Sequence, residues 1–120
     1  MKATIDGKAW EAKIVDFGGV FALISVIGKT DDANVLSLQF TETKLEVNKT
    51  YTFSIPAKEE NLSGNLVFTV NNNPLFATSG TFKITKYTRN KEIQGEMNAE
   101  FDNFVDKKAS LQNCTFSMKL

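Results

Sequence analysis

The sequence predicts an all-β fold, an antiparallel β-sandwich or a flattened barrel of about eight or nine strands. Apolar and polar residues alternate with a period of two in nearly every segment, whereas no stretch shows the apolar spacing of an amphipathic helix. The alternating runs are short and recur about every eight to twelve residues, with turn-forming residues between them. The 120 residues, 42% of them hydrophobic and ten of them phenylalanine, suit one domain, residues 1–120, with one core.

Two strands are expected at the start of the chain, Lys2–Ile5 and Lys8–Ile14. They flank Asp6 and Gly7, a pair of residues that accepts positive φ angles. Such a pair favours a two-residue type I′ turn, so the first two strands are predicted to form a tight hairpin.

A break, a central strand and a loop are expected next. Gly18 and Gly19 interrupt the alternation. The run Val20–Ile27 is apolar on both faces, which is typical of a central strand covered on each side. The segment Lys29–Asn34, with the sequence KTDDAN, has the composition of a polar loop.

Six further strands are predicted from alternation alone. Their inward-facing residues are Leu36, Leu38 and Phe40; Tyr51, Phe53 and Ile55; Leu66, Phe68 and Val70; Phe82 and Ile84; Ile93, Gly95, Met97, Ala99 and Phe101; and Cys114, Phe116, Met118 and Leu120. Pro56 ends the second of these runs. The segments Lys58–Gly64 and Asn71–Thr78 have the composition of loops, the fourth strand is predicted over Gly80–Tyr87, and Thr88–Glu92 is predicted to be a hairpin turn.

Composition and charge exclude several kinds of partner. Fourteen basic side chains balance fourteen acidic ones, so nucleic acid is not expected as a partner. No apolar run is long enough to span a bilayer as a helix. The first residues, MKATIDG, lack the apolar stretch of a signal peptide. The chain is therefore expected to be a cytoplasmic protein or a mature domain whose export signal has been removed.

The residues argue against catalysis. The sequence contains no histidine, which removes the Ser-His-Asp and Cys-His arrangements and the usual imidazole ligands of zinc. Cys114 is the only cysteine. It excludes an internal disulfide, and it lies in phase with Phe116 and Met118, where a thiol behaves as a small core residue. No glycine-rich phosphate motif is present, so no cofactor and no enzymatic activity are expected.

Acidic residues gather in one part of the sequence without forming a recognisable metal motif. Glu96, Glu100, Asp102 and Asp106 could in principle supply acid–base catalysis or oxygen ligands. Glu96 and Glu100 alternate with apolar residues, which favours a solvated strand face. The spaced pattern of a calcium loop is absent. We therefore expect neither catalytic nor metal-binding residues.

Several segments carry a family resemblance through their order along the chain. They are TIDGKAW, SVIG, NKTYTF, SGTFKITKYTRNKEIQGEMNAEF and CTFSMKL. In this order they resemble a family of small all-β lipoproteins of the outer membrane or periplasm of Bacteroidetes. The resemblance covers nearly the whole domain, with departures at Asn48-Lys49-Thr50, where the family usually has a glycine before the tyrosine, and at QGEMNAEF. It implies a β-domain behind a lipidated cysteine, membrane contact only through that anchor, and no reaction.

Three residues are candidates for binding. Trp10 follows the first hairpin, where a tryptophan most often caps the end of a core; a wall of a ligand site is the less favoured alternative. Leu75 and Phe76 lie in the turn-rich segment Asn71–Thr78. If exposed, they would offer an apolar tip to a partner, although packing over the end of the sandwich is favoured.

These observations predict a non-catalytic binding or structural module of the cell envelope. It is expected to engage a protein or glycan partner through loops such as Lys58–Gly64 and Asn71–Thr78. One alternative is a small β-barrel that encloses an apolar ligand, with Trp10 in its lining. Another is an accessory subunit of a larger assembly. The favoured interpretation assumes that the protein's own side chains fill the aromatic interior.

Overall fold

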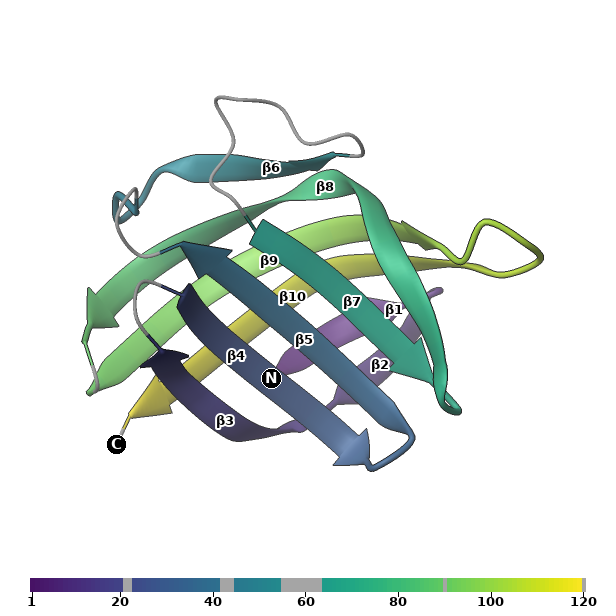
Figure 1. Cartoon of the computed structure of the whole chain (residues 1–120), viewed down its shortest axis with the longest axis horizontal. Coiled ribbons are helices and arrows are strands. Elements are labelled where there is room, and N and C mark those ends of the chain that lie inside the picture. Colours follow the sequence, from purple (N-terminus) through teal and green to yellow (C-terminus); the bar gives the residue numbers. More distant parts are fainter. Residues whose placement is uncertain (21–22, 42–44, 55–63, 90, 120) are drawn as a thin grey trace.

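The computed structural model describes residues 1–20, 23–41, 45–54, 64–89 and 91–119; for residues 15–20, 54 and 64 it describes the backbone alone. The described chain is built of β-strands (Figure 1). The strands are β1 (Lys2–Ile5), β2 (Lys8–Glu11), β3 (Lys13–Val20), β4 (Leu23–Asp31), β5 (Asn34–Thr41), β6 (Thr50–Ser54), β7 (Gly64–Val70), β8 (Asn73–Thr88), β9 (Glu92–Asp102) and β10 (Lys108–Lys119). The described residues include no helix that could span a membrane.

All of these strands belong to one antiparallel sheet that folds into two layers. The order along the sheet is β2-β1-β10-β9-β8-β7-β5-β4-β3, and β6 pairs with β8 away from this path. In Figure 1, β3, β4, β5 and β7 form the near layer, and their strands cross those of the far layer, which contains β8, β9, β10 and β1. The predicted all-β fold is confirmed, and both descriptions apply: the molecule is a flattened, nearly closed barrel whose opposite walls pack like a sandwich.

The long strand β8 forms one corner of the flattened barrel. Its first residues pair with β7, and the segment Ser79–Lys83 pairs with β6. A bulge between Ala77 and Ser79 and a positive φ of 131° at Gly80 mark the bend. A Cβ at Gly80 would collide with the backbone carbonyl of Asn98 on β9. Only glycine suits this position, because it needs both the positive φ and the close approach of two backbones.

The segment that joins β2 to β3 forms the opposite corner. Ala12 separates the two strands; β2 pairs with β1 and β3 pairs with β4. The N–H of Ala12 donates to the carbonyl of Met1 over 2.8 Å, and the Met1 ammonium donates to the carbonyl of Ala12 over 3.0 Å. These two bonds fix the point at which the chain passes from one layer to the other.

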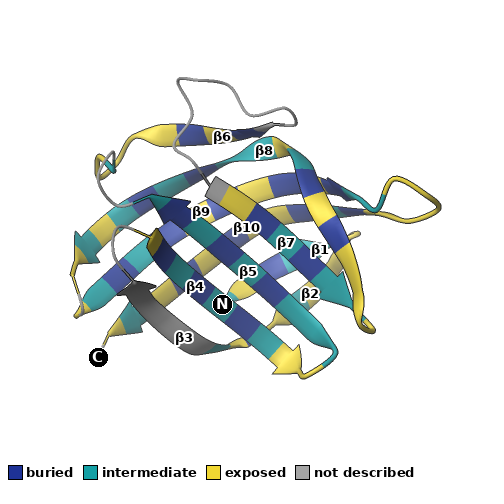
Figure 2. Cartoon of the chain, in the orientation of Figure 1, coloured by how far each residue is buried: buried dark blue, intermediate teal, exposed yellow. Residues whose placement is uncertain are grey.

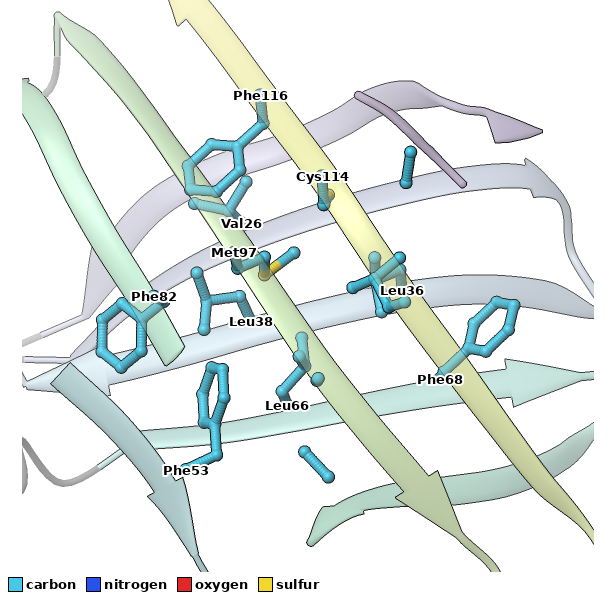
Figure 3. Packing of buried hydrophobic residues seen from close by; sticks show 14 of the residues in the cluster. Val26, Leu36, Leu38, Phe53, Leu66, Phe68, Phe82, Met97, Cys114 and Phe116 are labelled. Atoms are coloured by element: carbon cyan, nitrogen blue, oxygen red, sulfur yellow. The ribbon is translucent and has the colours of Figure 1, made fainter. Parts of the chain in front are cut away.

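The core lies between the two layers, where the alternating apolar residues meet (Figures 2 and 3). Leu36, Leu38 and Phe40 of the near layer are fully buried, as the alternation predicts. Phe82 of the far layer is surrounded by the rings of Phe40, Tyr51 and Phe53, with ring centroids 5.9, 5.4 and 4.9 Å away. Such ring pairs contribute about 0.5–1.5 kcal/mol each beyond the area they bury. The cluster therefore attaches β6 firmly to β8.

Most predicted core positions are confirmed. The predicted inward residues of β9 are all buried, as are Leu66, Phe68, Phe82, Ile84, Cys114 and Phe116. Val70 and Met118 are half-buried, whereas Ile55 and Leu120 lie outside the described residues. The first hairpin is also confirmed, because Asp6 and Gly7 have φ angles of 50° and 80°, as a type I′ turn requires.

Several predictions in the first half of the chain are wrong. The strand predicted over Lys8–Ile14 is divided at Ala12 into β2 and β3, and of the loop predicted over Lys29–Asn34 only residues 32–33 lie outside β4 and β5. Gly18 and Gly19 do not break the pattern, because both lie in β3 and pair with Ser25 and Ile24 of β4. Phe17 and Val20, which flank the two glycines in the sequence, also pair with β4, and this pairing keeps the glycines in the strand. The predicted strand over Val20–Ile27 is also not covered on each side: β4 begins at Leu23, which is 44% exposed, and buries only the face that carries Ile24.

Two boundaries in the second half also differ. The segment Asn71–Thr78 is predicted as a loop, yet β8 already begins at Asn73. Asn71 and Asn72, with φ angles of 50° and 67°, complete the turn alone, so that the following residues can pair with β7. The other predicted loop is Lys58–Gly64. Its residues 58–63 lie outside the described residues, and Gly64 is the first residue of β7.

Candidate functional site

Four turns gather at one end of the barrel, here called the hairpin end: Asp6-Gly7, Asp32-Ala33, Asn71-Asn72 and the loop at residues 103–107. Hydrogen bonds hold them in place. The N–H of Asn72 donates to the carbonyl of Ala33 over 3.0 Å, and the N–H of Ser110 donates to Oδ1 of Asp6 over 2.9 Å. The turns therefore form a fixed rim around the end of the core.

An open pocket lies inside this rim. Its volume is about 390 Å³, within the usual range of small-molecule sites. It is lined by the apolar residues Ile5, Trp10, Phe68, Val70, Leu75 and Ala109 and by the polar residues Asp6, Thr30, Asn34, Lys107 and Lys108. The apolar set forms most of the wall, and it comes from five strands that the barrel brings together at this end.

Trp10 forms one wall of this pocket. Its ring meets the ring of Phe68 edge-on, with 6.0 Å between the centroids and 81° between the planes. The side chain is half-buried and packs against the core cluster, and its strand partner is the buried Ala3. Trp10 is thus both the end cap favoured from the sequence and the wall of a pocket.

The other two candidate residues point in opposite directions. Leu75 is only 2% exposed and lines the pocket beside Trp10. Phe76 is 40% exposed and stacks on Phe104 of the 103–107 loop, with 6.4 Å between ring centroids. This difference follows from the strand, because neighbouring residues of β8 face opposite sides of the sheet. The favoured packing over the sandwich end therefore applies to Leu75 but not to Phe76.

The loop at residues 103–107 is braced by Asn103. Its Oδ1 accepts hydrogen bonds from the backbone N–H groups of Val105, Asp106 and Lys107 over 2.9–3.0 Å. Phe104 adopts a φ of 64°, which is unusual for a bulky residue. The result is a loop that holds Phe104 and Val105 outward, 62% and 87% exposed.

The polar side chains of the pocket differ in their freedom to bind a ligand. Nδ2 of Asn34 donates to Asp31, and Oδ1 of Asn34 accepts from the N–H of Asn71 over 3.2 Å. The bond from Asn34, followed by the bond from the N–H of Ala33, lowers the pKa of Asp31. Asp6 is bound to the backbone of β10, as described above.

Lys107 and Lys108 are different. Both are exposed, and within the described parts of the chain the ion pairs involve other lysines. They also line a second hollow of about 570 Å³ beside the 103–107 loop. Among the described residues, the two ammonium groups are therefore the charged side chains lining the pocket that have neither an ion pair nor a side-chain hydrogen bond.

The acidic residues and the cysteine considered for catalysis do not form a common site. Oε1 of Glu100 accepts from the hydroxyl of Ser110 over 2.9 Å, and Oδ1 of Asp102 accepts from the N–H of Phe104 over 2.7 Å. Across the described residues, no group of three or more acidic or cysteine side chains could hold a metal ion. Cys114 is fully buried, and this burial raises the pKa of its thiol to about 12.

A further hollow, of about 420 Å³, lies between β1, β8, β9 and β10 and is lined mainly by threonine, serine, glutamine and charged side chains. Phe116 is the one aromatic residue among its described lining residues, whereas the Trp10 pocket has two, Trp10 and Phe68. Sequence patterns could not identify the Trp10 pocket as a whole, because Phe68, Val70 and Ala109 look like ordinary core residues until the sheet closes. The two adjacent lysines carry no signal of their own in the sequence.

Comparison of the chain with protein-family models, with curated proteins and with solved structures found no match.

Proposed function

We propose that this protein is a non-catalytic binding module that holds a small, mainly apolar ligand in the pocket at the hairpin end. The observation that carries the proposal is the open apolar pocket beside Trp10. Apolar ligands gain roughly 25 cal/mol for each Å² of apolar surface removed from water. An unfilled apolar wall at the end of a packed core is the kind of surface that offers this gain without rearranging the protein.

The rim supports the same proposal. The turns at Asp6, Asn34 and Asn72 are held by hydrogen bonds to neighbouring strands and turns. A pre-formed site loses less conformational freedom when a ligand binds. The absence of histidine from the sequence and the buried thiol leave binding as a simpler role than turnover.

A pocket-filling variant tests the proposal. Val70 lines the pocket from β7, whereas Val67 lies on the other face of the same strand. Val70→Phe is expected to occupy part of the pocket and weaken binding of octanol and of similar apolar probes; Val67→Phe is the matched control. In the wild-type protein, a probe at about a hundred times its Kd should add about 2.7 kcal/mol to the free energy of unfolding.

The outcome can be measured by thermal unfolding and by the emission of Trp10, the only tryptophan in the chain. A library of apolar probes that shifts neither the melting temperature nor the emission of the wild-type protein would overturn the proposal. Equal shifts in the wild-type protein and in Val70→Phe would place the binding elsewhere.

A second candidate function is engagement of a protein or glycan partner of the cell envelope. Its support is the exposed apolar set of Phe76, Phe104 and Val105 beside the pocket, since exposed aromatic residues often anchor interfaces. The variant Phe104→Ser/Val105→Ser should then weaken the complex with a purified partner and leave binding of octanol unchanged. An unaltered complex would remove this candidate.

The envelope location belongs to the same proposal and rests on the lipoprotein resemblance. If it is right, the gene should encode an apolar leader that ends in a lipidated cysteine upstream of the domain. Fractionation of cells that express the natural gene would then place the protein with the envelope. Recovery of the protein in the cytoplasmic fraction would contradict it.

A further inference from the structure

The unpaired lysines at the pocket rim bear on the chemistry of the ligand. Lys107 and Lys108 line both the apolar pocket and the adjoining hollow beside the 103–107 loop. They therefore lie where the two spaces meet. A ligand with its apolar part against Trp10 would place a group that leaves the pocket within reach of these two ammonium groups.

The carboxylates of the same rim are already engaged. Asp6 accepts from the N–H of Ser110, Asp102 from the N–H of Phe104, and Asp106 from Nδ2 of Asn103 over 3.0 Å. These three acids outnumber the two lysines, so no strong positive field draws anions in. The two lysines instead offer hydrogen-bond donors that no side chain of the described chain occupies.

We propose that the ligand is amphipathic, with an apolar body against Trp10 and one anionic group, such as a carboxylate, held by Lys107 and Lys108. This inference rests on the proposed function of the pocket. A sugar fits less well, because sugar recognition needs several free polar groups. Asn34 and Asp6, which would supply them, are bound to the protein's own backbone and side chains.

A matched pair of probes tests the anionic group. Octanoate and octanol have apolar chains of equal length and differ in the charge of the head group. Both are titrated into the full chain and into Lys107→Gln/Lys108→Gln, with Trp10 emission and calorimetry as readouts. The control, Lys91→Gln/Lys119→Gln, removes two exposed charges at the opposite end of β9 and β10 (Figure 1).

The wild-type protein and the control are expected to bind octanoate more tightly than octanol. The Lys107→Gln/Lys108→Gln variant should bind octanoate about threefold to tenfold more weakly, because exposed charge pairs contribute little each. Its affinity for octanol should stay the same. Lys107→Arg/Lys108→Arg should retain the preference for octanoate.

Two results would overturn the inference and leave the proposed function standing. The first is an equal affinity of the wild-type protein for octanoate and octanol. The second is an equal loss of affinity for both probes in the Lys107→Gln/Lys108→Gln variant. If neither probe changes the emission of Trp10 in the wild-type protein, the proposed function fails as well. The comparison of octanoate with octanol therefore separates the two failures.

Discussion

Trp10 and Phe68 meet edge-on with 6.0 Å between their ring centroids, yet the first is half-buried and the second is only 5% exposed. The contact joins a core residue of β7 to a pocket wall on β2. Phe68 is held by the packing of the barrel core. Trp10 covers the end of that core with one side of its ring and borders the pocket with the other. Their replacement should therefore have different consequences.

Phe68→Ala is expected to lower the free energy of unfolding by about 3–5 kcal/mol, because it leaves a cavity in the core. Trp10→Ala should cost less, about 1–2 kcal/mol, because its side chain is only half-buried, but it should abolish binding of apolar probes. Urea unfolding followed by circular dichroism gives both values. A greater loss for Trp10→Ala than for Phe68→Ala would show that Trp10 belongs to the core alone.

The bend in β8 predicts a large penalty at Gly80. Gly80→Ala combines a positive φ with a collision against the carbonyl of Asn98, so it should cost about 3 kcal/mol or more. Gly7 is the matched control: its φ is 80°, but a Cβ there would meet nothing within 4 Å. Gly7→Ala should cost about 1–2 kcal/mol. Equal losses in the two variants would refute the close approach of β8 and β9.

The bracing of the 103–107 loop predicts a local effect. Asn103→Ala removes the acceptor of three backbone hydrogen bonds, so the amide protons of Val105, Asp106 and Lys107 should exchange faster with solvent. The free energy of unfolding should fall by less than about 1 kcal/mol, because the loop is exposed. Asn103→Asp keeps an acceptor oxygen and should retain most of the protection. Unchanged exchange in Asn103→Ala would show that the bonds contribute nothing.

Cys114 predicts how stability changes with pH. Its thiol has a pKa of about 12 in the folded protein, raised by burial from the ordinary 9.0. The folded state therefore keeps the thiol proton at a pH where the unfolded state has lost it. The contribution of Cys114 to the free energy of unfolding is complete below about pH 9 and is lost as the pH rises toward 12. The stability difference between the wild-type protein and Cys114→Ala should shrink over this range. At about pH 8, the thiol should react with a disulfide reagent only as fast as the protein opens. Rapid reaction of the folded protein would contradict its burial.

The alternating pattern predicted the strands well wherever one face of a strand meets the core. Leu36, Leu38 and Phe40 show this, since each is fully buried as expected. The pattern failed at Gly18 and Gly19, because pairing with β4 outweighs the weak strand propensity of glycine. It also failed at Asn73, because two preceding asparagines supply a complete turn.

The candidate site was less predictable than the strands, and the reason is geometric. Trp10 and Leu75 could be selected from the sequence as candidate residues, but not as lining the same pocket as Phe68 and Ala109. Their proximity depends on the closure of the sheet, which no short motif encodes. Phe76 was selected from the sequence together with Leu75, but it lies on the outer surface, because neighbouring residues of β8 face opposite sides of the sheet.

The most direct measurement of the central claim is the nuclear magnetic resonance signal of the indole N–H of Trp10 during a titration with octanoate. This signal is expected to shift until the site is saturated, and the methyl group of bound octanoate is expected to show through-space contacts to Trp10 and Leu75. No shift at Trp10 under conditions that saturate the protein, with contacts to Phe104 or Val105 instead, would contradict a ligand site inside the hairpin end.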